Sequence, residues 1–314
     1  MAQSWYSIVE EEMSRVDDVM RTEVRSAYPE LNKMCDETMN SRYHVVRPAL
    51  CILSYYANGG KDVDTAVNTA SCFEAVFEGL HLHDRIDSNG QVSGLKKKMF
   101  SKVPSTTKVI VAGDFMYVMG FRQAYGKVPK IVPYLMEASA SISDAIFKIT
   151  DNEHNAQISE QECLDIMRDK SAIEYEILME CAAKQAGADE ESLKIMRECG
   201  LYIGMALQLE ADIEDLFDDK ASMETMITGY PTLPIYYSMQ DEANGQKIKN
   251  LFSKQDLDQK EAVHAVTMIA KTDAVDRCRS MIKEYLGNAV SVIGKLPDSD
   301  YKSAIIAFAG NGVM

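Results

Sequence analysis

The chain lacks a long hydrophobic run, and this absence excludes a membrane-spanning helix of the usual kind. Its 314 residues contain no uninterrupted apolar stretch of about 18 residues, the length that such a helix needs. The first residues, MAQSWYSIVEEEMSRVDD, carry acidic side chains early and have no apolar segment typical of a secretory signal. We therefore expect a cytoplasmic protein with no membrane span and with a large buried core.

Basic residues are also scarce. The chain has 33 lysines and arginines against 48 aspartates and glutamates, which gives a formal net charge of −15. A general nucleic-acid binder needs a basic surface, so we expect no nucleic-acid partner. An acidic protein can still bind an anionic ligand when a divalent cation bridges the two.

Paired cysteines are missing as well. The chain has 7 cysteines, an odd number, and no two of them form a Cys-x-x-Cys pair. This pattern argues against a disulfide framework and against a zinc finger. Reduced thiols are the expected state in a cytoplasmic protein.

Alternating strand patterns are absent, and helical periodicity takes their place. Residues 134–229 contain no proline and carry long amphipathic stretches. Residues 66–83 place apolar side chains at the i, i+3, i+4 spacing of one buried helical face. The pattern predicts one all-α domain over residues 1–314, a bundle of roughly ten or more helices.

The segment FEGLHLHDRID (77–87) contains the first candidate site. If the helix runs through Asp87, His81 and His83 point about 200° apart and cannot share one metal ion, whereas a zinc-type His-x-His site needs a strand or loop. His83 and Asp84 each share a helical face with Asp87. Paired carboxylates suit Mg²⁺, which is often held together with substrate phosphates. The alternative is a polar helix end without chemistry.

The segment GMALQLEADIEDLFDD (204–219) repeats this pattern. Gln208, Asp212 and Asp215 stand at i, i+4 and i+7 on one stripe of a predicted helix, and Asp219 continues the stripe. An acidic, solvent-exposed face is the alternative interpretation. Two Asp-x-x-Asp helices in one chain nevertheless favour a pair of magnesium-binding motifs.

With both segments in view, the sequence resembles the trans-isoprenyl diphosphate synthase family, also called polyprenyl synthetases, over roughly residues 40–235. The other segments that carry the resemblance, in family order, are VVRPAL (45–50), VIVAGDFMYVMGF (109–121), DKSAIEYEILMECAAKQAGA (169–188) and GYPTLPI (229–235). The resemblance implies an all-α, isoprenoid synthase-like bundle around a deep central cavity, usually as a homodimer.

The resemblance also implies a reaction. Mg²⁺ bridges aspartates to an allylic diphosphate and stabilises the leaving pyrophosphate, and the double bond of isopentenyl diphosphate attacks the allylic carbocation. The implied catalytic residues are Asp84, Asp87, Asp212, Asp215 and Lys170. The four aspartates are also the implied metal ligands, with His83 beside them. The implied diphosphate-binding residues are His44, Arg47, Lys170, Ser171 and Gln208.

The chain departs from the family in its aspartate motifs, which normally read Asp-Asp-x-x-Asp. In the second motif, Ala211 replaces the first acid before Asp212. The first motif has two possible registers. Anchored on His83, it reads Asp84-Arg85-Ile86-Asp87-Ser88; shifted by one residue, it begins at His83 and ends at Asp87.

The expected isopentenyl diphosphate site is altered further. His44 stands where the family has lysine, Phe77 replaces a histidine, and Tyr230 replaces the lysine of Gly-Lys-x-Thr-Leu-Pro. The family's Arg-Arg pair after the first motif aligns near Ser93-Gly94, where this chain has no arginine, and Lys96, Lys97 and Lys98 follow closely as possible substitutes. Residues just before the first motif set product length in this family. Gly79 and Leu80, small and medium in size, predict an open cavity floor beneath Val76 and Phe77, which permits a longer product.

Three functions fit these observations. The first is a divergent Mg²⁺-dependent prenyltransferase that elongates an allylic diphosphate. The second is a non-catalytic member that binds prenyl diphosphates or forms a heteromer with a catalytic homologue. The third is a class I terpene synthase, although its expected Asn-x-x-x-Ser-x-x-x-Glu pattern is absent. His154 and His264 have no partner that the sequence identifies.

Overall fold

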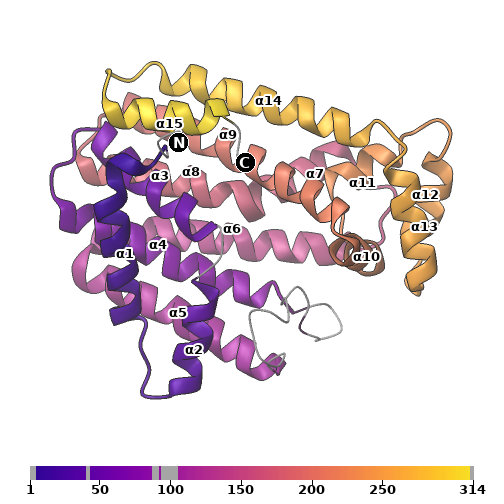
Figure 1. Cartoon of the computed structure of the whole chain (residues 1–314), viewed down its shortest axis with the longest axis horizontal. Coiled ribbons are helices and arrows are strands. Elements are labelled where there is room, and N and C mark those ends of the chain that lie inside the picture. Colours follow the sequence, from indigo (N-terminus) through magenta and orange to yellow (C-terminus); the bar gives the residue numbers. More distant parts are fainter. Residues whose placement is uncertain (1–4, 40–42, 87–91, 93–104, 312–314) are drawn as a thin grey trace. The chain divides into compact units, whose positions relative to one another are not determined.

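The computed structural model describes residues 5–39, 43–86, 92 and 105–311 (Figure 1). Within these residues the chain is helical almost throughout, and the only β-type pairing is an isolated antiparallel bridge between Ile86 and Val92. The prediction of an all-α fold with roughly ten or more helices is confirmed for this part of the chain.

The helices follow one another with short connections. In chain order they are η1 (Ser7–Val9), α1 (Glu10–Glu23), α2 (Pro29–Thr38), α3 (Tyr43–Ala57), α4 (Val63–His83), α5 (Thr106–Lys127), η2 (Pro129–Ile131), α6 (Val132–Asp151), α7 (Glu160–Met167), η3 (Arg168–Ala172), α8 (Ile173–Ala186), α9 (Glu190–Phe217), α10 (Asp219–Thr228), α11 (Leu233–Ser238), α12 (Gly245–Phe252), α13 (Gln259–Ile269), α14 (Ala274–Ile293) and α15 (Asp300–Asn311).

Short polar residues set where several helices begin. The Asp62 carboxylate accepts a hydrogen bond from the Asp64 amide at the start of α4. Ser159 and Glu162 form a capping box at the start of α7, in which each side chain binds the other residue's backbone amide. These bonds satisfy amide donors that have no partner within the helix, so the sequence itself fixes these boundaries.

The chain divides into two compact units. The first unit comprises Met1–Ser139, Glu174–Gly200 and Ala289–Gly312, and the second comprises Ala140–Ile173, Leu201–Asn288 and Val313–Met314. Helices α6, α9 and α14 each contribute residues to both units. The prediction of a single domain over residues 1–314 stays a prediction.

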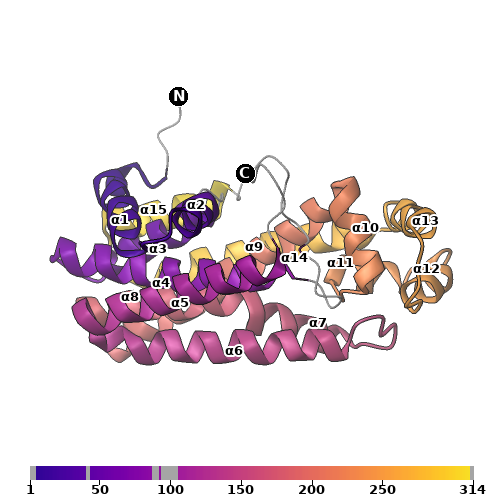
Figure 2. The same ribbon diagram turned by 90° about the horizontal axis from the view of Figure 1, so that it is seen from below.

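In the first unit, α4 packs against α1, α3 and α5. Helices α4 and α5 run side by side (Figure 2). Their backbones meet at glycines: a Cβ on Gly79 would lie 2.8 Å from the Gly113 carbonyl oxygen and 2.8 Å from the Tyr117 amide nitrogen. The backbone of α5 therefore fills the space beside Gly79, and the expectation that Gly79 opens a cavity floor is wrong.

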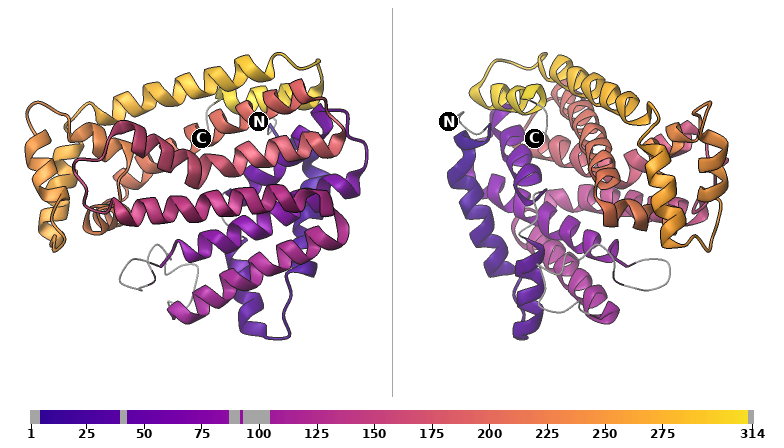
Figure 3. Two further views of the ribbon diagram at one scale, coloured as in Figure 1. Left: turned by 180° about the vertical axis from the view of Figure 1, so that it is seen from behind. Right: turned by 45° about the vertical axis from the view of Figure 1, so that its right-hand side comes forward.

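In the second unit, α13 packs against α10 and α12, and α11 packs against α7. Helices α12 and α13 lie next to each other in both views of Figure 3. The core of this unit includes the fully buried residues Leu209, Ile248, Phe252, Ile269 and Cys278. This core holds α9 and the turns that carry the second group of candidate site residues.

All seven cysteines lie buried and unbonded. Burial raises the pKa of Cys163 and of Cys278 to about 12, so these thiols carry their protons at neutral pH. Among the described helices, none is both long and apolar enough to cross a membrane.

Candidate functional site

The second unit carries Gln208 and Asp212 on α9, as predicted. The Gln208 amide donates a 2.7 Å hydrogen bond from Nε2 to Asp212 Oδ1. Burial raises the pKa of Asp212 to about 7; the Gln208 hydrogen bond and the Lys170 charge oppose this rise, while the Asp215 charge adds to it. A cation near these two carboxylates would favour their charged forms.

Asp215 follows Asp212 on the solvent-exposed part of α9. The prediction that Asp219 continues this stripe is wrong, because α9 ends at Phe217. The Asp218 carboxylate accepts hydrogen bonds from the Lys220 and Ala221 amides and caps a new helix, α10. Asp219 is the first residue of α10, so the aspartate stripe of α9 ends at Asp215.

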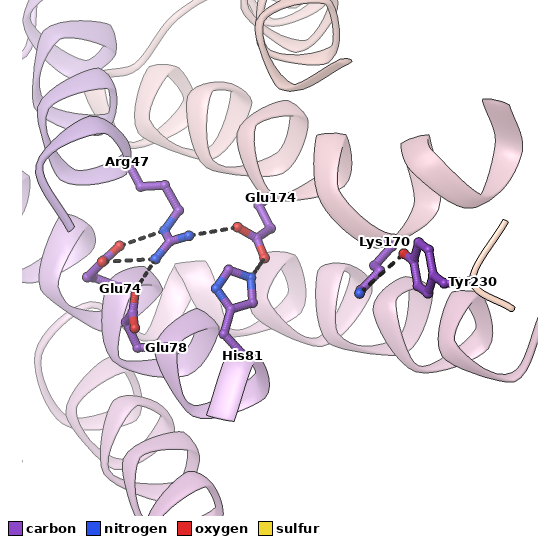
Figure 4. Close-up of polar contacts among 7 residues, drawn as sticks. All are labelled: Arg47, Glu74, Glu78, His81, Lys170, Glu174 and Tyr230. Carbon is purple, nitrogen blue, oxygen red and sulfur yellow. Dashed lines mark hydrogen bonds and ion pairs between the residues drawn. The ribbon is translucent and has the colours of Figure 1, made fainter. Parts of the chain in front are cut away.

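Lys170 and Ser171 lie in η3, a single π-helical turn between α7 and α8. Such turns interrupt an α-helix and are frequent at functional sites. The Lys170 ammonium donates a long 3.4 Å hydrogen bond from Nζ to the Tyr230 hydroxyl, and it lies 5.2 Å from the centre of that ring (Figure 4). Because the Lys170 charge also acts on Asp212, the second unit brings a cation, an amide and a carboxylate into one electrostatic group.

The first aspartate motif has a different local structure from the one predicted. Helix α4 ends at His83, Asp84 is its exposed C-cap, and Arg85 lies in the following turn. The expectation that the helix runs through the motif is therefore wrong. Because α4 ends before Asp84, helical geometry does not place Asp84 and Asp87 on one face. Asp87 itself lies outside the described residues.

His81 and His83 have separate partners in the structure. His81 Nε2 lies 2.6 Å from Glu174 Oε1 on α8. His83 Nε2 lies 3.2 Å from the Ile110 carbonyl oxygen and 3.2 Å from Asp114 Oδ1, both on α5. No three His, Cys, Asp or Glu residues in the described part of the chain form a group suited to a metal ion. The metal-ligand role of His83 stays a prediction.

Arg47 lies at the centre of a buried charge cluster in the first unit. Only 1% of its side chain is exposed. Its guanidinium donates to Glu74 at 2.8 and 3.0 Å, to Glu78 at 2.5 Å and to Glu174 at 3.1 Å (Figure 4). These bonds use four of the five N–H donors of the guanidinium, and the predicted diphosphate-binding role of Arg47 stays a prediction.

The pKa values of the other basic groups near this cluster reflect both burial and the nearby carboxylates. Burial lowers the pKa of His81, but the charge and the hydrogen bond of Glu174 together raise it by more, so the net shift of this pKa is upward. Burial also lowers the pKa of Arg85, whereas the nearby Glu78 raises it. The positive charge of Arg47 thus offsets part of the negative charge of the three glutamates, as a low-dielectric interior favours.

Sequence reasoning missed this cluster, although half of its pattern was visible. Glu74, Glu78 and His81 stand at i, i+4 and i+7 on α4, the same spacing that identified the stripe on α9. Their partner Glu174 is 93 residues from His81 along the chain. Helical periodicity does not reveal which residues of other helices meet such a stripe.

The remaining predicted residues of the isopentenyl diphosphate side are only partly placed. The backbone of His44 belongs to α3, but its side chain lies outside the described residues, as do Ser93, Gly94 and Lys96–Lys98. Phe77 is fully buried, with its ring centre 5.6 Å from that of Phe73. The position where the family has a histidine is thus filled by a core aromatic residue.

Comparisons with known proteins agree with this arrangement. The chain is 22% identical to octaprenyl diphosphate synthase of Haemophilus influenzae, over 96% of this chain and 93% of the relative. It is also 22% identical to heptaprenyl diphosphate synthase component 2 of Bacillus subtilis, over 97% of this chain and 88% of the relative.

Solved structures share the fold. Heptaprenyl diphosphate synthase from Staphylococcus aureus superposes with a TM-score of 0.84 at 21% identity, covering 96% of this chain and 97% of that one. A polyprenyl synthase from Caulobacter crescentus gives a TM-score of 0.82 at 18% identity, covering 97% and 95%. The family model for polyprenyl synthetase matches residues 28–269, a span that includes every motif on α3, α4, α5 and α9, and the chain therefore belongs to the polyprenyl synthetase family.

Proposed function

We propose that this protein is a trans-prenyltransferase that condenses an allylic diphosphate with isopentenyl diphosphate in isoprenoid biosynthesis. The observation that carries the proposal is the group formed by Lys170, Gln208 and Asp212 in the second unit. Family membership supports it, as do the names of the relatives, which are polyprenyl diphosphate synthases. The C. crescentus structure is described as complexed with calcium and isoprenyl diphosphate.

Asp212 and Asp215 are a pair of carboxylates of the kind that holds Mg²⁺ together with substrate phosphates. Asp212 has a pKa of about 7 partly because the charge of Asp215 is close, and a cation relieves that repulsion. We propose that Asp84, Asp87, Asp212 and Asp215 hold Mg²⁺, which would neutralise the charge that develops on the leaving diphosphate. The raised pKa of Asp212 also makes metal binding depend on pH, because the carboxylate must lose its proton first.

The chain's own cation and amide have separate roles in this proposal. The carbon–oxygen bond of the allylic diphosphate breaks, and its electron pair leaves on the diphosphate. Lys170 stabilises that negative charge, and Gln208 keeps the Asp212 carboxylate oriented. The double bond of isopentenyl diphosphate then attacks the allylic cation and forms the new carbon–carbon bond. The released diphosphate takes up the proton that is lost as the new double bond forms.

The contacts of Arg47 favour a second function, that of a non-catalytic subunit. Its guanidinium is bound by three glutamates, so in this arrangement it is directed at carboxylates rather than at a substrate. A non-catalytic subunit that pairs with a catalytic homologue needs no isopentenyl diphosphate site. The name of the B. subtilis relative, component 2, gives this alternative additional support.

One assay separates these functions. The purified chain is incubated with Mg²⁺, labelled isopentenyl diphosphate and dimethylallyl, geranyl or farnesyl diphosphate. Elongated product supports the prenyltransferase, and pyrophosphate release without elongation indicates a terpene synthase. A chain that is inactive by itself but alters the product of an added catalytic homologue supports the role of a non-catalytic subunit.

We also propose that the chain forms a homodimer through α5. Val111, Val118 and Tyr125 are 51%, 59% and 80% exposed and repeat every seven residues, which gives an apolar stripe on that helix. Sedimentation of the native chain should give twice the monomer mass, and Val118→Asp should give the monomer mass. A native chain that sediments as a monomer contradicts this.

A cytoplasmic location completes the proposal, and cell fractionation tests it.

A further inference from the structure

His154 has an unusual backbone conformation. Among the described residues, it is the only non-glycine residue with a positive φ, at 60°. A residue with a Cβ adopts this left-handed region at a cost, and it stays there when its surroundings hold it in place. The contacts of His154 therefore indicate what this conformation serves.

Two hydrogen bonds hold His154 in the second unit. Its amide donates to the Gly229 carbonyl oxygen at 3.0 Å. Its ring nitrogen Nδ1 lies 2.8 Å from the Phe252 carbonyl oxygen. Because a carbonyl oxygen only accepts, Nδ1 carries the proton and donates. The residue thus ties the turn before α7 to the ends of α10 and α12.

Gly229 is fitted to this contact. Its φ is 66°, and a Cβ there would lie 2.4 Å from the His154 amide nitrogen and 2.5 Å from Cγ of the imidazole ring. Any larger residue at position 229 must therefore push His154 away. Gly229 also ends α10, where its amide donates to the Thr225 carbonyl oxygen.

The next residue carries this geometry toward the candidate site. The Tyr230 amide donates to the Thr225 carbonyl oxygen at 3.1 Å, so the backbone of the turn is fixed on both sides of Gly229. The Tyr230 hydroxyl accepts the hydrogen bond from Lys170, and its ring lies near the ammonium (Figure 4). A chain of direct contacts thus runs from His154 through Gly229 and Tyr230 to Lys170.

We propose that His154 is a positioning residue: it holds the Gly229–Tyr230 turn so that Tyr230 fixes the ammonium of Lys170 where a diphosphate binds. The inference rests on the proposed function, since it takes Lys170 as a diphosphate ligand. A lysine side chain has a flexible four-carbon stem. An ammonium that is already restrained loses less conformational freedom when it binds an anion, so affinity rises.

The test uses the full chain and inorganic pyrophosphate with Mg²⁺, with affinity measured by calorimetry. His154→Gly keeps the left-handed backbone accessible and removes the ring, and it should weaken pyrophosphate binding about fivefold. His154→Asn should restore part of the affinity, because asparagine tolerates this conformation and its amide can donate to the Phe252 carbonyl. The melting temperature of each variant reports stability separately.

A double-mutant cycle distinguishes positioning from a general loss of stability. Lys170→Met removes the charge that His154 is inferred to position. In that background His154→Gly should leave the remaining pyrophosphate affinity unchanged, because the effect of His154 reaches pyrophosphate only through the turn and Lys170. A purely structural role for His154 predicts the same fold-loss in both backgrounds, and that result overturns the inference.

Glycine variants give a matched control. Gly229→Ala should weaken pyrophosphate binding, since its Cβ displaces His154. Gly187 has a similar φ of 86°, but no atom would lie within 4 Å of a Cβ there. Gly187→Ala should therefore lower the melting temperature and leave the affinity unchanged.

The outcomes separate this inference from the proposed function. Pyrophosphate binding that depends on Lys170 but is unchanged in His154→Gly and Gly229→Ala overturns the inference and leaves the proposed function standing. A native chain that does not bind pyrophosphate with Mg²⁺ overturns both. A fivefold loss in His154→Gly that disappears in the Lys170→Met background supports the inference.

Discussion

At the residue scale, Asp212 links the stability of the protein to pH. Its pKa rises from 3.8 to about 7 in the folded chain, because burial and, to a smaller extent, the Asp215 charge outweigh the opposing effects of the Gln208 hydrogen bond and the Lys170 charge. The folded state therefore binds a proton between these pKa values that the unfolded state has released. The contribution of Asp212 to stability must fall as pH rises through this window.

Replacing Asp212 by Asn should remove this dependence. The melting temperature of the metal-free native chain should fall between about pH 4 and pH 7 relative to that of Asp212→Asn, which has no titrating group at this position. Thermal unfolding of both proteins across this range, without Mg²⁺, measures the difference. Parallel curves would show that the pKa of Asp212 is not raised.

Arg47 stabilises the folded protein, because its positive charge neutralises buried carboxylates. Arg47→Met leaves Glu74, Glu78 and Glu174 without their central cation, and the expected loss in unfolding free energy is about 3–5 kcal/mol. The control is Arg15→Met, since Arg15 pairs with Asp64 on the surface and such pairs contribute about 0–1 kcal/mol. Urea unfolding measures both variants, and equal midpoints would contradict the buried cluster.

At the element scale, helical periodicity predicted the existence of α4 and α9 and the placement of Gln208 and Asp212 on one stripe. It did not predict where these helices end. The Asp218 cap interrupts the stripe before Asp219, and α4 stops at His83. Asp219 keeps the spacing of the stripe although it belongs to the next helix, so periodicity alone does not reveal that α9 ends before it.

The contact between α4 and α5 shows a second limit of periodicity. Gly79 is a small residue in the sequence, but only the structure shows that the backbone of α5 lies against it. Gly79→Ala should lower the unfolding free energy by about 1–3 kcal/mol, because the added Cβ forces the two backbones apart.

Gly126 provides the matched control for this prediction. It lies in the last turn of α5, and no atom would lie within 4 Å of a Cβ there. Gly126→Ala should be neutral or stabilising by up to about 1 kcal/mol, through helix propensity. Chemical denaturation of both variants decides, and a Gly79→Ala protein as stable as Gly126→Ala would disprove the close approach of the helices.

At the scale of the whole molecule, the order of the motifs along the chain predicted the family, and the match over residues 28–269 confirms it. Side-chain contacts between distant segments could not be predicted from the sequence, because they depend on which helices pack together. The cluster of Arg47 with Glu174 joins residues 127 apart, and the contact of Lys170 with Tyr230 joins residues 60 apart. A net charge of −15 disfavours binding of a free diphosphate, so we expect diphosphate affinity to depend on Mg²⁺.

The most direct measurement is the incorporation of labelled isopentenyl diphosphate into prenyl products by the native chain, Asp212→Ala and Asp219→Ala. We expect elongation by the native chain with Mg²⁺ and none with a chelator. Asp212→Ala should lose about 10²–10³-fold in rate, because a group that stabilises the leaving diphosphate is gone. Asp219→Ala, which removes a nearby acid outside the α9 stripe, should retain the native rate. Elongation at the native rate by Asp212→Ala, or none by the native chain, would contradict the account.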